Sequence, residues 1–183
     1  MKILGINCMN HDASMSVVDY SSGIGEVLWA AHAERYSKVK NDHYLNWHIV
    51  NEAMTYGPFD KVVYYEKPWL KKTRQLYAGQ WADAFSYTEM PQWHLDHFKI
   101  KIDEYVKHHD SHAAAGYFTS PFREATILTV DAIGEWDTVS ISTADKVWIE
   151  RKETIKYPHI IGILYSACTH RCGLKPAEEE YIL

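Results

Sequence analysis

The chain carries the apolar stretch Ile3-Leu4-Gly5-Ile6-Asn7, and its second half repeats this pattern as Ile127-Leu128-Thr129-Val130-Asp131. The pairing continues without a gap from Ala13–Val17 onto Asp137–Ile141. Each copy has the pattern of a buried strand, a short polar turn and an alternating strand, because apolar runs and period-two alternation are typical of strands. The duplication predicts two lobes of one α/β fold, with the turn of each lobe facing a shared cleft.

The length and composition are those of a chain that can bury a sizeable core. The chain has 183 residues, 46% of them hydrophobic, and a formal net charge of -5. A negative balance argues against a general nucleic-acid surface, because binding to phosphates needs clustered cations. The longest apolar stretch, Ile160–Ala167, is too short to cross a bilayer, and the first residues lack a signal-peptide pattern. We therefore expect no nucleic-acid partner, no membrane partner and a cytoplasmic location.

Periodicity predicts most of the secondary structure and two lobes. The lobes are expected at residues 1–122 and 123–183, with the first nearly complete and the second cut short. Helices are expected over Trp47–Met54, after an N-cap at Asp110, and over Ile160–Cys172. Residues 67–98 are rich in aromatic side chains but show no clear period, so we expect them to cover the core rather than to form an acceptor pocket. The predicted strands are Lys2–Cys8, Met15–Tyr20, Glu26–Ala33, Lys61–Tyr65, Tyr105–Val106, Ala125–Val130, Thr138–Ser142 and Val147–Thr154.

Two histidines four residues apart precede the second copy of the repeat. On a helix His108 and His112 share one face, and two neutral imidazoles at this spacing form a common clamp for a divalent metal. The alternative is a pair of half-buried histidines that make ordinary hydrogen bonds. His109, between them, is expected to point elsewhere and to have a structural role.

The polar turn of the first copy contains a candidate general base. His11 lies between two strands beside Asp12, and an imidazole in such a turn can accept a proton from a hydroxyl group. Lys40, which follows the third strand, can hold an anion, although solvated surface charge is the simpler interpretation.

The polar turn of the second copy is acidic and contains a glycine. Asp131, Gly134 and Glu135 can hold a metal, bind a phosphate through backbone amides, or simply make a bend. We assign these three residues, together with Lys40, to cofactor binding.

The chain has three cysteines, an odd and unclustered number that does not suggest a disulfide framework. Cys168 and Cys172 would share a helix face near His170, but two thiols are not a closed zinc site. We expect Cys168 and Cys172 to be small core residues rather than metal ligands.

Several ordered motifs together resemble one known family, the O-carbamoyltransferases of the nodulation and antibiotic-biosynthesis type. The resemblance runs nearly from end to end of the chain. The matching motifs are Ile3–Ile6, His11–Ser14, Ala33–Lys40, Tyr64–Pro68, His108–Ala114, Ser120–Phe122, Thr129–Trp136 and Tyr157–Ser166.

The resemblance implies an actin/sugar-kinase-like fold, built from two ribonuclease-H-like lobes. In the family, carbamoyl phosphate and ATP give a carbamoyl adenylate in a separate domain, and the N-terminal domain moves the carbamoyl group to an acceptor hydroxyl. The resemblance also implies a metal, typically iron, held by His108, His112 and an aspartate further downstream than this chain extends. It implies that His11 is the base.

The leading hypothesis is therefore the N-terminal portion of an O-carbamoyltransferase that acts on a small-molecule hydroxyl acceptor. It would use a divalent metal, with ATP and carbamoyl phosphate as substrates of the complete enzyme. One rival is a non-catalytic subunit that binds a metal or a partner chain without turnover, and either hypothesis predicts self-association or a partner. A second rival is a phosphoryl-transferring enzyme of the same fold, which the glycine-poor turn at His11 argues against.

Overall fold

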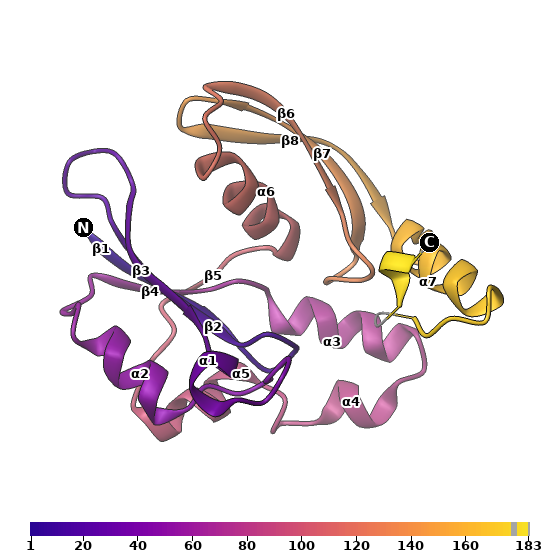
Figure 1. The fold of residues 1–183 in the computed structure, drawn as a ribbon, viewed down its shortest axis with the longest axis horizontal. Coiled ribbons are helices and arrows are strands. Elements are labelled where there is room, and N and C mark those ends of the chain that lie inside the picture. The colour runs from indigo at the N-terminus through magenta and orange to yellow at the C-terminus, as the bar shows by residue number, and fades with distance from the viewer. Residues whose placement is uncertain (177–178, 183) are drawn as a thin grey trace. The chain divides into compact units, whose positions relative to one another are not determined.

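The computed structural model in Figure 1 describes residues 1–176 and 179–182. The chain divides into two compact units, Met1–Val106 and Lys107–Leu183. The division differs from the expected boundary after residue 122, because helix α6 (His108–Phe118) packs on the strands of the second unit. Residues 177, 178 and 183 of the expected second lobe lie outside the described part of the chain.

The first unit is built on a five-stranded sheet with the order β3-β2-β1-β4-β5. The three N-terminal strands pair antiparallel, and β4 and β5 continue the sheet parallel to β1. Such an order of strands is that of a ribonuclease-H-like lobe, and it confirms the α/β class predicted from the sequence. The strands are β1 (Lys2–Asn7), β2 (Ser14–Asp19), β3 (Glu26–His32), β4 (Lys61–Tyr64) and β5 (Glu104–Tyr105).

Alternation along the strands of the first unit places apolar side chains in one core. Leu4 and Ile6 of β1 are buried beside Met15 and Val17 of β2, as period-two alternation requires. Helix α1 (Glu34–Ser37) follows β3, and helix α2 (Trp47–Met54) buries three apolar residues against this core. Helix α2 begins at Trp47 because the Asn46 side chain accepts the backbone N–H groups of the helix's second and third residues.

The cysteines differ from one another in burial. Cys8 lies in the core at the end of β1, and burial raises the pKa of its thiol to about 12. The prediction that Cys168 and Cys172 are core residues is wrong, because both are exposed. They lie at the end of helix α7 (Ile161–Arg171), where Thr169 is the buried residue of that helix.

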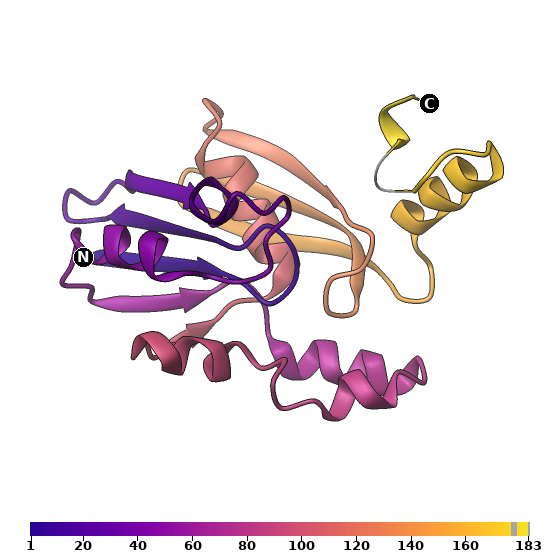
Figure 2. The same ribbon diagram turned by 60° about the horizontal axis from the view of Figure 1, so that its bottom comes forward.

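The aromatic-rich segment forms short helices that the hydrophobic pattern of the sequence did not predict. They are α3 (Pro68–Tyr77), α4 (Trp81–Phe85), α5 (Pro91–Leu95) and the 3₁₀ turn η1 (Asp96–Phe98). Helices α3 and α4 pack side by side (Figure 2), and the Lys72 ammonium of α3 donates to the carbonyls of Asp83 and Ser86. The expectation that these aromatics mainly cover the core is wrong for Tyr77 and Phe85, which are largely exposed.

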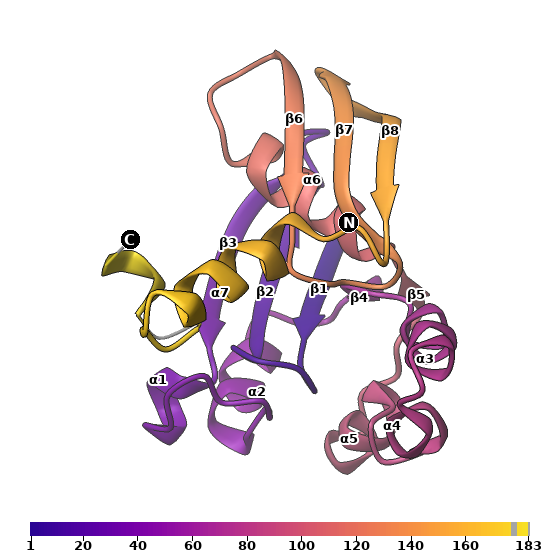
Figure 3. The same ribbon diagram turned by 90° about the vertical axis from the view of Figure 1, so that its right-hand side faces the viewer.

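The second unit repeats the first three strands. Strands β6 (Glu124–Val130), β7 (Asp137–Asp145) and β8 (Trp148–Lys156) form an antiparallel sheet in that order (Figure 3). They correspond to β1, β2 and β3, so the structure confirms the duplication and the actin/sugar-kinase-like class. Helix α6 lies against one face of this sheet, and helix α7 and the 3₁₀ turn η2 (Glu180–Ile182) follow β8 (Figure 1).

Strand β6 exposes apolar side chains on the second sheet. Leu128 pairs with Ile141 across β6 and β7, and their exposed fractions are 64% and 36%. Val130, two residues further along β6, is 47% exposed. In the described part of this sheet β6 is an edge strand, and an apolar edge favours association with another chain.

We therefore expect the purified chain to self-associate at high concentration. Sedimentation velocity across a concentration series should show a rising weight-average mass, and Leu128→Glu should shift the chain toward the monomer. Ile24→Glu makes the same type of change at an exposed turn of the first unit and should leave the mass distribution unchanged. A concentration-independent monomer would contradict the expectation.

Candidate metal centre

Helix α6 brings His108 and His112 together, as their spacing predicted. The helix begins at His108, directly after the extended residue Lys107. The two Nε2 atoms lie 3.0 Å apart, and the ring centroids are separated by 4.7 Å. Both histidines therefore direct a ring nitrogen to the same point on one face of the helix.

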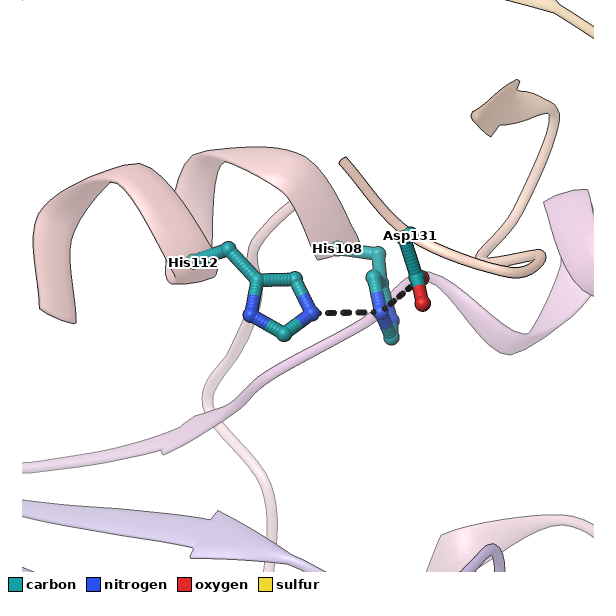
Figure 4. Close-up of side chains that lie close together, drawn as sticks. All are labelled: His108, His112 and Asp131. Carbon is teal, nitrogen blue, oxygen red and sulfur yellow. Dashed lines mark hydrogen bonds and ion pairs between the residues drawn. The ribbon is translucent and has the colours of Figure 1, made fainter. Parts of the chain in front are cut away.

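Asp131 completes a group of three possible ligands. It follows the last residue of β6, and its Oδ2 lies 2.9 Å from the Nε2 of His108. Figure 4 shows the His108 ring between His112 and this carboxylate, and one possible ligand atom from each residue lies within 4.8 Å of the others. The sequence assigned Asp131 to cofactor binding but did not place it beside the two histidines.

The donor set fits a divalent transition metal. Two imidazole nitrogens and one carboxylate oxygen on one side of an ion are the ligands of many non-haem iron(II) sites, which leave further positions open. Two ligands at right angles around an ion, each about 2.1 Å from it, are about 3 Å apart. The separations of 3.0 and 2.9 Å match that value, so His108 can be a neighbour of both His112 and Asp131 around one ion.

The carboxyl group of Asp131 is ionised at any physiological pH. Burial by itself would raise its pKa, but the hydrogen bond and charge of His108, the backbone N–H of Ala132 and the charge of His112 lower it to about 2. The carboxylate is therefore ready to bind a cation without first losing a proton.

His109 has a structural place, as its position between the other two histidines suggested. It is 1% exposed, and its Nδ1 lies 2.9 Å from the Oγ of Ser140 on β7. Burial lowers the pKa of its imidazole, which favours the neutral form. The ring thus fastens helix α6 to the sheet, with its centroid 6.2 and 6.3 Å from those of His108 and His112.

The expected N-cap at Asp110 is wrong, because helix α6 begins at His108 and its N-cap residue is Lys107. Asp110 lies in the first turn of the helix and pairs with the Arg151 guanidinium of β8, which also pairs with Asp137 of β7. The backbone N–H of His108 donates instead to the Glu135 carboxylate, at 3.2 Å. Glu135 is buried, and so is Gly134 beside it.

The candidate base lies in the turn between β1 and β2. His11 is exposed, and its Nδ1 lies 2.7 Å from the Oδ2 of Asp12. With Nδ1–H donating to this carboxylate, Nε2 is the basic nitrogen of the ring. Asp12 adopts a left-handed backbone conformation with φ 53°, and Asn7 donates to its carbonyl at 3.0 Å.

Neighbouring backbone holds this turn in place. The N–H groups of Met9 and Ala13 donate to the carbonyls of His43 and Asp42, at 2.8 and 2.7 Å. Lys40 is an exposed residue of the segment that precedes Asp42.

The matches with known proteins agree with the motifs. The family described as Carbamoyltransferase N-terminus matches residues 2–183. The chain belongs to this family. Two curated relatives are similar to it: Uncharacterized protein sll1178 of Synechocystis sp., 29% identical over 99% of the chain, and Uncharacterized protein MJ1051 of Methanocaldococcus jannaschii, 28% identical over 97% of the chain. This member of the carbamoyltransferase family spans 33% and 31% of their lengths, about a third of each.

Two solved structures are also similar to this carbamoyltransferase-family chain. The ethanolamine utilization protein EutJ from Carboxydothermus hydrogenoformans has a TM-score of 0.45 and 12% identity, with 100% of this chain and 61% of that chain covered. The Aquifex aeolicus PPX-GPPA enzyme also has a TM-score of 0.45 and 12% identity, with 99% and 59% covered.

Within the described residues, every helix is too short or too polar to span a bilayer.

Proposed function

We propose that this chain is the metal-binding transferase portion of an O-carbamoyltransferase, which moves a carbamoyl group from carbamoyl adenylate to an acceptor hydroxyl. Membership of the carbamoyltransferase family supports carbamoyl transfer as the reaction. The observation that carries the proposal is the cluster of His108, His112 and Asp131, whose two imidazoles and one ionised carboxylate fit a catalytic divalent metal. We propose iron as that metal.

The proposed reaction has a simple balance of bonds. The acceptor oxygen attacks the carbamoyl carbon, the bond from that carbon to the adenylate phosphate oxygen breaks, and AMP leaves. The proton of the acceptor hydroxyl goes to Nε2 of His11, which Asp12 holds through Nδ1. Asp131, His108 and His112 would hold the metal, which supplies Lewis-acid polarisation of the carbamoyl group. Lys40 is our candidate for contact with the adenylate phosphate.

The rival proposal is a subunit that binds a metal or a partner chain without turnover of its own. The exposed apolar residues of β6 support a partner surface, but they do not explain three converging ligand atoms in one cluster. Transfer of label to an acceptor distinguishes the two proposals.

The test supplies this chain with the portion that completes the length of its curated relatives, loaded with iron(II) under anaerobic conditions. The protein is incubated with ATP, carbamoyl phosphate labelled on its carbon, and a panel of polyhydroxylated acceptors. We expect label in an alkali-labile carbamate on at least one acceptor, with one AMP released for each carbamate formed. Metal binding without label transfer to any acceptor would favour the non-catalytic rival.

A further inference from the structure

We propose that Gly134 and Glu135 are positioning residues, which fix the ligand His108 before a metal binds. The two residues lie in the turn Asp131–Glu135, whose first member belongs to the candidate metal centre. The turn therefore does more than supply one carboxylate, because it also sets where the imidazole opposite that carboxylate can lie. This inference rests on the proposed metal centre, and it assigns to Gly134 and Glu135 a role other than contact with a cofactor.

The backbone of Gly134 lies against the ring of His108. A Cβ atom at residue 134 would lie 2.7 Å from Cδ2 and 2.9 Å from Cγ of His108. Real Cβ atoms essentially never approach other heavy atoms so closely, so any side chain here would displace the imidazole. The imidazole cannot turn away freely, because His108 is 7% exposed and its Nε2 already faces Asp131.

Glu135 contacts the backbone of His108. Its side chain is 4% exposed, and Oε1 accepts the backbone N–H of His108 at 3.2 Å. His108 is the first residue of α6, and Lys107 before it makes no side-chain cap. The carboxyl oxygen therefore takes the place of a cap for the first N–H of the helix.

Three contacts thus fix His108 along its length. Glu135 holds the backbone nitrogen, Gly134 leaves just enough room for the ring carbons, and Asp131 meets Nε2. Only the last contact comes from a candidate ligand. The other two determine the angle at which the ring meets the metal, and such supporting contacts strengthen metal sites by restricting ligand motion.

The turn is itself held in place. The Asp131 N–H donates to the Thr138 carbonyl at 3.0 Å, and the Ala132 N–H donates to Oδ1 of Asp131 at 2.7 Å. Gly162 of α7 lies so close to this turn that a Cβ there would be 2.8 Å from the Cα of Ala132. A turn braced on both sides can act as a fixed support for the ring of His108.

The test measures metal affinity in matched variants of the chain. Cobalt(II) serves as the probe, because its visible absorption reports both binding and the symmetry of the ligands. We expect Gly134→Ala to weaken cobalt binding by about 10- to 100-fold, the range for lost supporting contacts, and to change the absorption spectrum. Gly116→Ala is the control, since it adds the same methyl group on α6 where nothing lies within 4 Å.

Glu135 is tested by replacement and rescue. Glu135→Ala should weaken cobalt binding within the same range, whereas Glu135→Gln should recover most of the affinity, because its amide oxygen still accepts the His108 N–H. Far-ultraviolet circular dichroism and a thermal melt check that each variant is folded. If Gly134→Ala does not fold, the cobalt affinities of Glu135→Ala and Glu135→Gln test the positioning role instead.

The outcomes separate the two proposals. Wild-type protein that binds no cobalt would overturn the metal centre and this inference with it. Wild-type protein that binds cobalt, with unchanged affinity and spectrum in the folded Gly134→Ala and Glu135→Ala variants, would overturn the positioning role alone. A glutamine variant as weak as the alanine variant would overturn the role of Glu135 as the acceptor for His108.

Discussion

The double variant His108→Ala, His112→Ala is expected to lose its bound divalent metal completely. The two Nε2 atoms and the Asp131 carboxylate are the only cluster of three possible ligands among the described residues, and the change leaves one of the three. A single carboxylate holds a transition metal too weakly to survive dialysis. The measurement is metal content per chain after loading with iron(II) or cobalt(II) and dialysis, and wild-type protein should keep a stoichiometric ion.

The matched control replaces two exposed histidines of the same unit. His159→Ala, His170→Ala removes as many imidazoles without touching the cluster, so its metal content should equal that of the wild type. Both double variants should melt cooperatively in the absence of metal, which shows that loss of the ion is not loss of the fold. Equal metal content in the two double variants would contradict the assignment of the centre to α6.

Replacement of His11 by alanine is expected to lower carbamoyl transfer by about 10²- to 10⁴-fold, the range for a lost general base. The assay again supplies the portion that completes the length of the curated relatives, because we propose that this portion makes the carbamoyl adenylate. The physical reason is that the acceptor hydroxyl loses the imidazole that takes its proton. Asp12 remains, but its role is only to orient that imidazole. The rate of label transfer to acceptor is the measurement, and metal content should not change.

An exposed histidine elsewhere in the first unit provides the control. His48→Ala, on the solvent side of α2, should transfer at the wild-type rate. Asp12→Asn should lie between the two, because the imidazole remains but loses the charge that holds it. A His11→Ala protein that transfers label at the wild-type rate would remove His11 from the mechanism.

Local patterns were enough to predict much of the fold. Period-two alternation located the strands of both units to within a few residues, and the repeat from Ile3 onto Ile127 predicted that β6, β7 and β8 follow the order of β1, β2 and β3. The four-residue spacing also predicted that His108 and His112 share a helix face. These features depend on residues close in sequence, so the sequence carries them directly.

Other features depend on packing between elements and were not predicted. Asp131 meets His108 only because α6 packs on β6, and no local pattern reports that distance. Asp110 has the residue type of an N-cap, but Arg151 pairs with it, and the distant Glu135 holds the first N–H of the helix instead. Helices α4 and α5, with five residues each, are too short to show a period.

The metal centre comes from one continuous part of the chain. Its three candidate ligands lie between residues 108 and 131, whereas the first sheet must join β1 to β4 across the residues between Asn7 and Lys61. Closing a short loop costs less conformational entropy than closing a long one, and contacts that are near in sequence form faster. The ligand cluster is therefore among the parts of this protein that can assemble early in folding, when an ion that binds it also begins to stabilise helix α6 against β6.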